Sequence, residues 1–324
     1  MKKNKYIPVA LTLLSTLALT STGCVKSDKP AAASAKISVV TTNFPPYDFV
    51  RAVAGDMAEV TMLLPPASES HSFEPRPQDI LKIQKSGVFV YTGGESDAWA
   101  EKIMGSIDSP KMKVVAMLKC VDAVEEEIVE GMEEKKGAGG DKKGGGEESE
   151  YDEHVWTSPR NAKSIVKKIT ETLCEVDPAN ADTYRQNTAA YLSELDELDA
   201  RFKGVVDGAA RKVVVFGDRF PFRYFADAYG IKYFAAFPGC ATETEASAKT
   251  VAFLIEKVKK EKIPVVFHIE LSNEKMANTI SEATGAKVRL LHSCHNVTRA
   301  DFLAGKTYVD FMSANVDALR EALK

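Results

Sequence analysis

Apolar positions between residues 36 and 178 alternate between short β-branched runs and longer segments with helical spacing. The strand-like runs cover residues 36–42, 59–64, 88–91 and 113–118, and the helix-like segments cover residues 45–55, 77–86 and 97–105. Strands that alternate with helices in this way predict a parallel sheet whose faces are covered by helices. We therefore expect an α/β lobe over residues 36–178.

A single long amphipathic segment follows this lobe. Its apolar side chains recur at steps of three and four positions: Tyr191, Leu195, Leu198, Phe202 and Val206. This spacing is typical of one face of a helix, and Asp177-Pro178 is a start signal. We expect one rigid linking helix over residues 179–206.

The alternation of strands and helices then restarts. Strand-like runs cover residues 212–216, 233–237, 265–269 and 287–291, and helix-like segments cover residues 221–229, 246–260, 273–284 and 309–323. The predicted fold class is therefore α/β, with two lobes that each contain a parallel sheet flanked by helices. The second lobe is assigned to residues 207–324, and the long helix joins the two.

Residues 125–153 interrupt the first lobe. They are rich in Glu, Lys and Gly and hold almost no apolar side chains. Such a segment buries too little apolar surface to order itself, so we expect a disordered acidic loop that ends just before His154. It is either a solvated insertion or a weak collector of cations.

The N-terminal residues have the pattern of an export signal. Basic residues 1–5 precede an apolar stretch at residues 7–20, which is too short to span a bilayer, and small residues lead to Cys24. Residues 1–24 resemble a bacterial lipoprotein signal, in which Cys24 would carry the lipid; an ordinary cleaved signal is the alternative. With residues 25–35 as a flexible tether, we expect an exported protein, anchored at the cell membrane and facing the periplasm or the exterior.

Charge and cysteine content narrow the class further. The net charge of −4 provides no basic face for nucleic acid. Export permits disulfides, and Cys240 and Cys294 each follow a predicted strand of the second lobe. Loops after parallel strands gather at one edge of the sheet, so we predict a Cys240–Cys294 disulfide. The competing hypothesis is that these thiols bind a metal; whether Cys120 and Cys174 pair stays open.

Candidate metal ligands lie in four loops at strand ends or helix starts. His71 and His154 come from the first lobe, and Asp218, His292 and His295 come from the second. Imidazole is the commonest nitrogen ligand in proteins, and nitrogen with one oxygen suits zinc or manganese rather than calcium. We therefore predict a metal-capture site in the cleft between the lobes.

Several stretches together resemble a known family. They are residues 71–79, 93–99, 154–159 with Asn161-Ala162, and 305–308 through Asn315. They are similar to the substrate-binding lipoproteins of zinc and manganese ABC transporters, the class with a long backbone helix between two lobes. The resemblance implies a binding protein rather than an enzyme. It would capture Zn²⁺, with Mn²⁺ as the alternative, and deliver it to a membrane permease.

The resemblance also implies a ligand set. His71 and His154 match the family's two histidines of the first lobe. The loop that normally supplies the third histidine has none, and Asp218 is the candidate there, with Glu270 behind it. The family's final carboxylate position is occupied by His292, so the expected ligands are His71, His154, His292 and Asp218.

The remaining histidines receive supporting roles. His295 is expected to orient its neighbour, and His268 is expected to pack in the core of an apolar strand. Some zinc-binding members of the family carry a histidine-rich insertion, and the insertion here contains no histidine. Zinc stays the preferred metal because three imidazoles favour it over manganese.

Two other functions remain open. A zinc hydrolase would use Glu153 or Glu270 as a general base, although no His-Glu-Xaa-Xaa-His spacing is present. A surface adhesin would use the lobes as an interaction platform. Turnover of esters or peptides would favour the first, and metal-independent binding to a host matrix protein would favour the second.

Overall fold

The computed structural model describes residues 36–107, 109–132, 151–241 and 245–324. The expected signal peptide with Cys24, the tether at residues 25–35 and most of the acidic insertion lie outside these described residues. Across the described ranges, none of the helices combines the length and the apolar character needed to cross a membrane.

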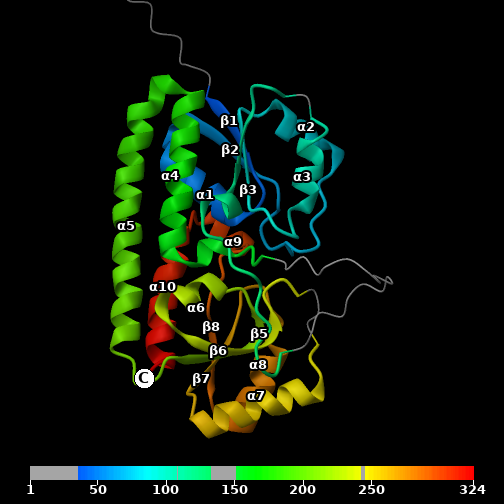
Figure 1. Ribbon diagram of the computed structural model, residues 1–324, viewed down its shortest axis with the longest axis vertical. Helices are drawn as coiled ribbons and strands as arrows, with labels where there is room; N and C mark the ends of the chain where they lie inside the picture. The colour runs from blue at the N-terminus through cyan, green and yellow to red at the C-terminus, as the bar shows by residue number, and fades with distance from the viewer. Residues whose placement is uncertain (1–35, 108, 133–150, 242–244) are drawn as a thin grey trace, which may run out of the picture. The chain divides into compact units, whose positions relative to one another are not determined.

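The first half of the chain forms a four-stranded parallel sheet with the strand order β2-β1-β3-β4, of which β1, β2 and β3 are labelled in Figure 1. Its strands are β1 (Ile37–Thr41), β2 (Ala58–Met62), β3 (Val88–Tyr91) and β4 (Lys113–Ala116). Its helices are α1 (Phe44–Ala54), α2 (Pro77–Lys85), α3 (Ala98–Met104) and α4 (Pro159–Val176). The predicted α/β class is confirmed for this half.

The second half repeats the same topology, with the strand order β6-β5-β7-β8. Its strands are β5 (Val213–Phe220), β6 (Lys232–Pro238), β7 (Val265–His268) and β8 (Lys287–Leu290). Its helices are α6 (Arg223–Tyr229), α7 (Ala248–Glu261), α8 (Lys275–Thr284), α9 (Arg299–Leu303) and α10 (Tyr308–Ala322). In both sheets the loops after the strands gather at one edge, where such folds build their sites.

Helix α5 (Ala181–Asp207) is the predicted long helix, and it lies beside α4 (Figure 1). Helix α4 was not among the helical segments expected from the sequence. Its signals were nonetheless present: Ser158-Pro159 suits a helix start, and apolar residues recur with helical spacing. These residues are Ala162, Ile165, Val166, Ile169 and Leu173.

The largest hydrophobic core runs through both halves. It includes Val39 and Trp156 from the first half and Phe216, Phe267 and Val316 from the second. Two smaller cores form separately, one within each half. The shared core holds the strand-end loops of the two sheets against each other, and the candidate site lies among those loops.

The start of the acidic insertion is packed, which corrects the expectation of a disordered loop from residue 125. Glu125 pairs with Tyr151 in an antiparallel bridge, and Met132 is buried. Glu127 accepts a hydrogen bond from the Tyr233 hydroxyl at 3.0 Å. These residues order because their carboxylates find donors on the second half and their few apolar side chains find the core.

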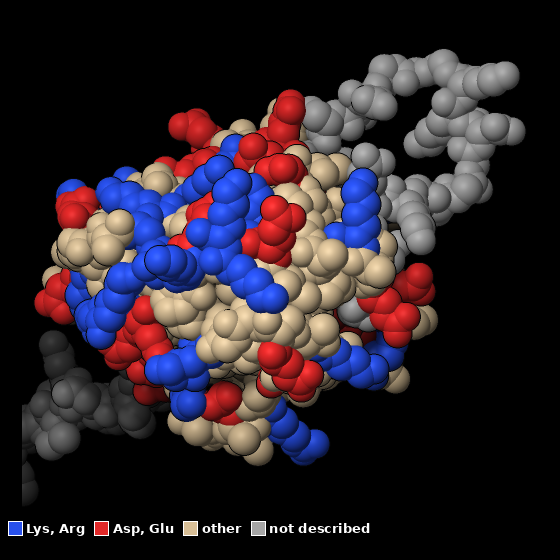
Figure 2. Space-filling view, turned by 90° about the horizontal axis from the view of Figure 1, so that it is seen from below, with Lys and Arg blue, Asp and Glu red and all other residues tan. Residues whose placement is uncertain are grey.

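Charged side chains of both signs are interspersed on the face seen from below in Figure 2. Many of the ion pairs join residues three or four positions apart on one helix, such as Lys203 with Asp207 and Arg320 with Asp317. Exposed pairs of this kind contribute little to stability. Buried titratable side chains, in contrast, are found in the loops at the strand ends, among them Glu153, His154 and Glu270.

Candidate metal centre

His71 lies in the loop between β2 and α2, and a neighbouring carboxylate orients its ring. Its Nδ1 is 2.9 Å from Oε1 of Glu69. Because an ionised carboxylate only accepts hydrogen bonds, Nδ1 carries the proton and donates it. The Nε2 atom is buried and has no hydrogen-bond partner among the described residues. A lone pair is therefore left facing the interior.

His154 is arranged in the same way at the other side of the site. It precedes the short helix η3 (Val155–Thr157), is fully buried, and places Nδ1 3.0 Å from Oδ1 of Asp152. Burial has the largest single effect on the pKa of His154 and would lower it. The charge and hydrogen bond of Asp152, together with the charges of Glu153 and Glu126, outweigh burial, so the pKa is raised. Its Nε2 also lacks a hydrogen-bond partner among the described residues. Histidines that ligate metals typically donate their other N–H to a carboxylate in this manner.

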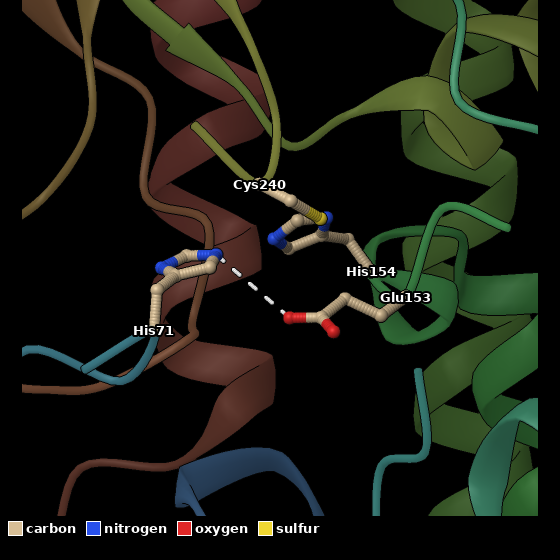
Figure 3. Close-up of side chains that lie close together, drawn as sticks. All are labelled: His71, Glu153, His154 and Cys240. Atoms are coloured by element: carbon tan, nitrogen blue, oxygen red, sulfur yellow. Dashed lines mark ion pairs between the residues drawn. The ribbon is translucent and has the colours of Figure 1, made fainter. Parts of the chain in front are cut away.

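Four side chains bring possible ligand atoms together. Those of His71, Glu153, His154 and Cys240 all lie within 4.8 Å of one another (Figure 3). Zinc with tetrahedral bonds of the usual length separates its ligands by about 3.5 Å. A small contraction of this cluster would therefore enclose an ion.

Glu153 is the carboxylate of this cluster and is held by another loop. Oε2 accepts a hydrogen bond from the Ser96 N–H at 3.0 Å, and Oε1 accepts one from the Ser96 hydroxyl. Oε1 also lies 3.8 Å from Nε2 of His71. A Cβ at Gly94 would come within 2.8 Å of the Glu153 Cβ, so glycine allows this close approach.

His295 supplies a third imidazole beside the cluster. Its ring centroid is 4.8 Å from that of His71 and 5.1 Å from that of His154. Burial lowers the pKa of His295 well below its usual value, and the two other imidazoles lower it further. His295 is therefore neutral at physiological pH, the form that binds metals.

His292, which the sequence analysis expected as a ligand, does not join this group. Its ring stacks on Phe311 with centroids 4.1 Å apart, and its Nδ1 accepts a hydrogen bond from the Cys294 N–H at 3.0 Å. Cys294 adopts a left-handed backbone conformation with φ of 62°. This turn gives the two histidines different neighbours: the His295 ring lies beside those of His71 and His154, whereas the His292 ring lies on Phe311.

Asp218, the expected fourth ligand, is not among the four side chains of this cluster. β5 continues past Phe216 with a register shift, so Asp218 lies in a strand irregularity rather than in a loop. Its two carboxylate oxygens accept the N–H groups of Arg219 at 2.8 Å and Ile269 at 3.2 Å. They tie the end of β5 to the end of β7.

Two further residues singled out in the sequence, Glu270 and His268, have hydrogen-bond partners at the ends of strands. Glu270 borders the cavity at the site, but its carboxylate accepts N–H groups from Ser293 and His295, at 2.7 Å and 3.0 Å. It positions their loop. His268 is half-buried rather than packed in the core, with Nδ1 2.9 Å from the carbonyl oxygen of Ile269.

The predicted disulfide is not formed in this structure. Cys240 and Cys294 are not bonded to each other: the Sγ of Cys294 lies 3.9 Å from the His292 carbonyl oxygen, whereas the thiol of Cys240 lies in the cluster. Cys120 and Cys174 also remain unbonded to each other. The loops do gather at one sheet edge, but the turn at Cys294 directs its thiol into the core, where it is fully buried.

Hydrogen bonds between the loops of the two halves close the site. The Asn296 side-chain amide donates to the carbonyl oxygens of Pro65 and Ser68, both at 2.8 Å. The Trp156 indole N–H donates to the Ser293 carbonyl oxygen at 2.7 Å. The histidines of the first half and the loop that carries His295 are thereby held in register.

The fold and the site together define a two-lobed α/β protein with a buried group of metal-ligand side chains between its sheets. Residues 39–322 match the family model described as zinc-uptake complex component A, periplasmic. The chain belongs to this family.

Relatives with curated descriptions agree with this assignment. The chain is 33% identical over 313 residues to the zinc-binding lipoprotein AdcA of Streptococcus pneumoniae strain R6, and the match covers 97% of this chain and 60% of AdcA. The chain thus spans about 60% of the length of that relative. It is 30% identical to the high-affinity zinc uptake system protein ZnuA of Bacillus subtilis, over 89% of this chain and 88% of ZnuA.

A solved structure shares the same architecture. The Zn(II)-bound ZnuA-like domain of Streptococcus pneumoniae AdcA superposes with a TM-score of 0.73 at 31% sequence identity. The match covers 89% of this chain and 99% of that domain. The arrangement of two sheets and a long helix is therefore common to both.

Proposed function

We propose that this chain is the extracytoplasmic metal-binding component of an ABC importer. It captures Zn²⁺ between its two halves and delivers the ion to a membrane permease. An N-terminal lipid on Cys24 would hold it at the membrane. The zinc-binding descriptions of its relatives and the family's description as a periplasmic zinc-uptake component support this proposal.

The observation that carries the proposal is the pair of Nε2 atoms on His71 and His154, which have no hydrogen-bond partner within the part of the chain that the structure describes. A buried nitrogen without a hydrogen bond costs free energy unless something else satisfies it. In both residues Nδ1–H is hydrogen-bonded to a carboxylate, so the lone pair of Nε2 is available to bind a metal ion. A zinc ion bound to both nitrogens would satisfy them together.

We assign His295, in place of His292, as the third imidazole of the site. Its neutral ring lies against both other histidines and comes from the second half of the chain. Three imidazoles favour zinc over manganese, for which oxygen ligands are better suited. A site whose donors come from both halves also links ion binding to the contact between them.

Metal content and affinity test the proposal directly. Protein purified without chelators should contain zinc, and calorimetry should show tighter binding of Zn²⁺ than of Mn²⁺. His71→Ala should weaken zinc binding by more than the roughly 10- to 100-fold that loss of an outer-shell partner costs. His268→Ala is the matched control, because His268 lies outside the cluster. Unchanged zinc affinity in His71→Ala would contradict the assignment.

The two other functions are separated from this one by direct assays. A zinc hydrolase would turn over ester or peptide substrates only when loaded with zinc, and that turnover would be lost in His154→Ala. An adhesin would bind a host matrix protein equally well after removal of the metal. Metal capture without either activity is the expected result.

A further inference from the structure

Cys240 follows the end of β6 and places its sulfur among the donor atoms of the site. Its Sγ lies within 4.8 Å of the ligand atoms of His71, Glu153 and His154 (Figure 3). The other described cysteines have different surroundings. Cys120, Cys174 and Cys294 all direct their thiols toward backbone carbonyl oxygens.

The backbone beside Cys240 is shaped for this position. A Cβ at Gly239 would lie 3.0 Å from Cε1 of His154 and 3.1 Å from the Phe220 carbonyl oxygen, tighter than most side chains tolerate. Glycine therefore lets the turn lie directly against the His154 ring. The Cys240 N–H donates to Oε1 of Glu126 at 3.0 Å, which holds the turn from the other side.

We propose that Cys240 is a thiolate ligand of the captured ion, which makes the centre a mixed imidazole and thiolate site. This inference rests on the proposed function and names a ligand for it. As the sulfur–zinc bond forms, the thiol proton leaves to solvent, because the thiolate is the binding form. The thiolate supplies negative charge that the two neutral imidazoles lack, and the Glu153 oxygens are already engaged by Ser96.

A sulfur ligand has a consequence for the choice of metal. Thiolates are soft donors that favour Zn²⁺ and Cd²⁺ over Mn²⁺, which prefers carboxylate and water oxygens. Cys240 is therefore a specificity-determining residue. It strengthens the preference for zinc that the imidazoles alone would provide.

Cobalt substitution tests the sulfur ligand without depending on transport. The protein loaded with Co²⁺ alone should show a sulfur-to-cobalt charge-transfer band in the near ultraviolet. Cys240→Ser should lose the band, and the matched variant Cys174→Ser should keep it. Circular dichroism of the metal-free variants checks the fold, and Cys240→Ala provides a second variant without a hydroxyl.

Calorimetry with Zn²⁺ and Mn²⁺ gives the second readout. Cys240→Ser should lower zinc affinity by more than about 10-fold, at least the cost of losing an outer-shell partner. It should change manganese affinity much less, so the ratio of the two affinities falls. Equal losses for both metals would overturn the role in specificity.

The outcomes separate this inference from the function on which it rests. A wild-type protein that binds zinc through His71 but shows no cobalt–sulfur band would overturn the thiolate ligand and leave metal capture standing. Failure of the wild type to bind zinc would overturn both. Peptide mapping that finds Cys240 in a disulfide in the purified, metal-loaded protein would also overturn it, because a disulfide sulfur is not available as a thiolate.

Discussion

The first half of the molecule orients its histidines with carboxylates from the same short loops, whereas the second half uses groups that are distant in sequence. Glu69 precedes His71 by two positions, and Asp152 precedes His154 by two positions. Each carboxylate accepts a hydrogen bond from the Nδ1–H group and leaves the Nε2 lone pair directed inward. These two imidazoles are therefore oriented by local sequence.

In the second half, the residues at the site are held by hydrogen bonds from residues that are distant in sequence. The His295 N–H is held by Glu270, 25 positions earlier, and the Cys240 N–H is held by Glu126, 114 positions earlier. The direction of the His295 ring also depends on the left-handed turn at Cys294. The side chains of His295 and Cys240 therefore take their positions only when the two halves of the chain are folded and packed together.

The difference suggests distinct tasks for the two halves. Locally oriented imidazoles are preorganised and lose little entropy on binding an ion. Donors held by distant contacts respond to how the halves pack against each other. We expect substitutions in the first half to act mainly through the ligand, and those in the second half to act through both ligand and loop.

Removal of an imidazole from the first half should have the largest effect. His154→Ala should reduce zinc affinity by more than about 100-fold, above the range for outer-shell partners. The metal-free protein should also lose stability, because Asp152 would keep its buried charge without the ring. Calorimetry and thermal unfolding without metal separate the two effects, and zinc affinity near that of the wild type would refute the role of His154.

The neighbouring histidines of one loop provide the sharpest test of the second half. His295→Ala should lower zinc affinity by about 10- to 100-fold. His292→Asn should stay within about 2-fold, as expected for a residue without shared partners at the site. Asparagine is chosen because its side-chain oxygen can still accept the Cys294 N–H. The reverse ranking in calorimetry would restore His292 as the ligand.

The carboxylates that orient the first-half histidines should have intermediate effects. Asp152→Asn and Glu69→Gln should each weaken zinc binding by about 10-fold, because they leave the tautomer and direction of the ring less defined. The effect of Asp152→Asn should shrink as the pH falls. Asp152 raises the pKa of His154, so the wild-type ring gains a proton, and loses its zinc, at a higher pH than the ring of the variant. Affinities measured across the pH range check this; a gap that widens toward acid would contradict it.

The sequence predicted the fold well because strands and helices differ in the period of their apolar residues. It singled out His71 and His154 because their loops carry family motifs, and their possible ligand atoms do lie within 4.8 Å of each other. The acidic residues that precede them are visible in the sequence as well. It expected Cys240 in a disulfide, with metal binding by the thiol as the alternative, and His295 as a residue that orients its neighbour. The positions of both beside His71 and His154 could not be predicted, for a physical reason. Their placement depends on the absence of a Cβ at Gly239 and on the left-handed turn at Cys294, and neither contact is encoded by local periodicity. Asp218 was misplaced because β5 continues through an irregularity beyond Phe216.

Arg219, from the second half, contacts the carboxylate that orients a histidine of the first half. From β5 its guanidinium reaches Oε2 of Glu69 at 3.2 Å and the Ala241 carbonyl oxygen at 3.2 Å. It also lies 3.3 Å from Nδ1 of His71. The hydrogen bond from His71 lowers the pKa of Glu69 well below its usual range, and the charge of Arg219 lowers it further. Glu69 is thus ionised throughout the physiological pH range. It accepts hydrogen bonds from His71 of the first half and from Arg219 of the second half.

Arg219→Gln should have the smallest effect on affinity, because Glu69 is half exposed and water replaces part of the lost interaction. Ion pairs at a protein surface are worth up to about 1 kcal/mol. Because Arg219 is 11% and Glu69 48% exposed, we expect a change of about 5-fold. The change should appear mainly as faster zinc release, since this contact joins the two halves around the bound ion. The rate of zinc release into a chelator, measured by stopped flow, should differ most from that of the wild type at low salt. The two rates should converge as added ions screen the pair.

Arg223→Gln is the matched control, because Arg223 pairs with Glu127 and Asp227 away from the cluster. A release rate that is equally fast in both variants, or independent of salt, would mean that Arg219 packs at the site without linking the halves.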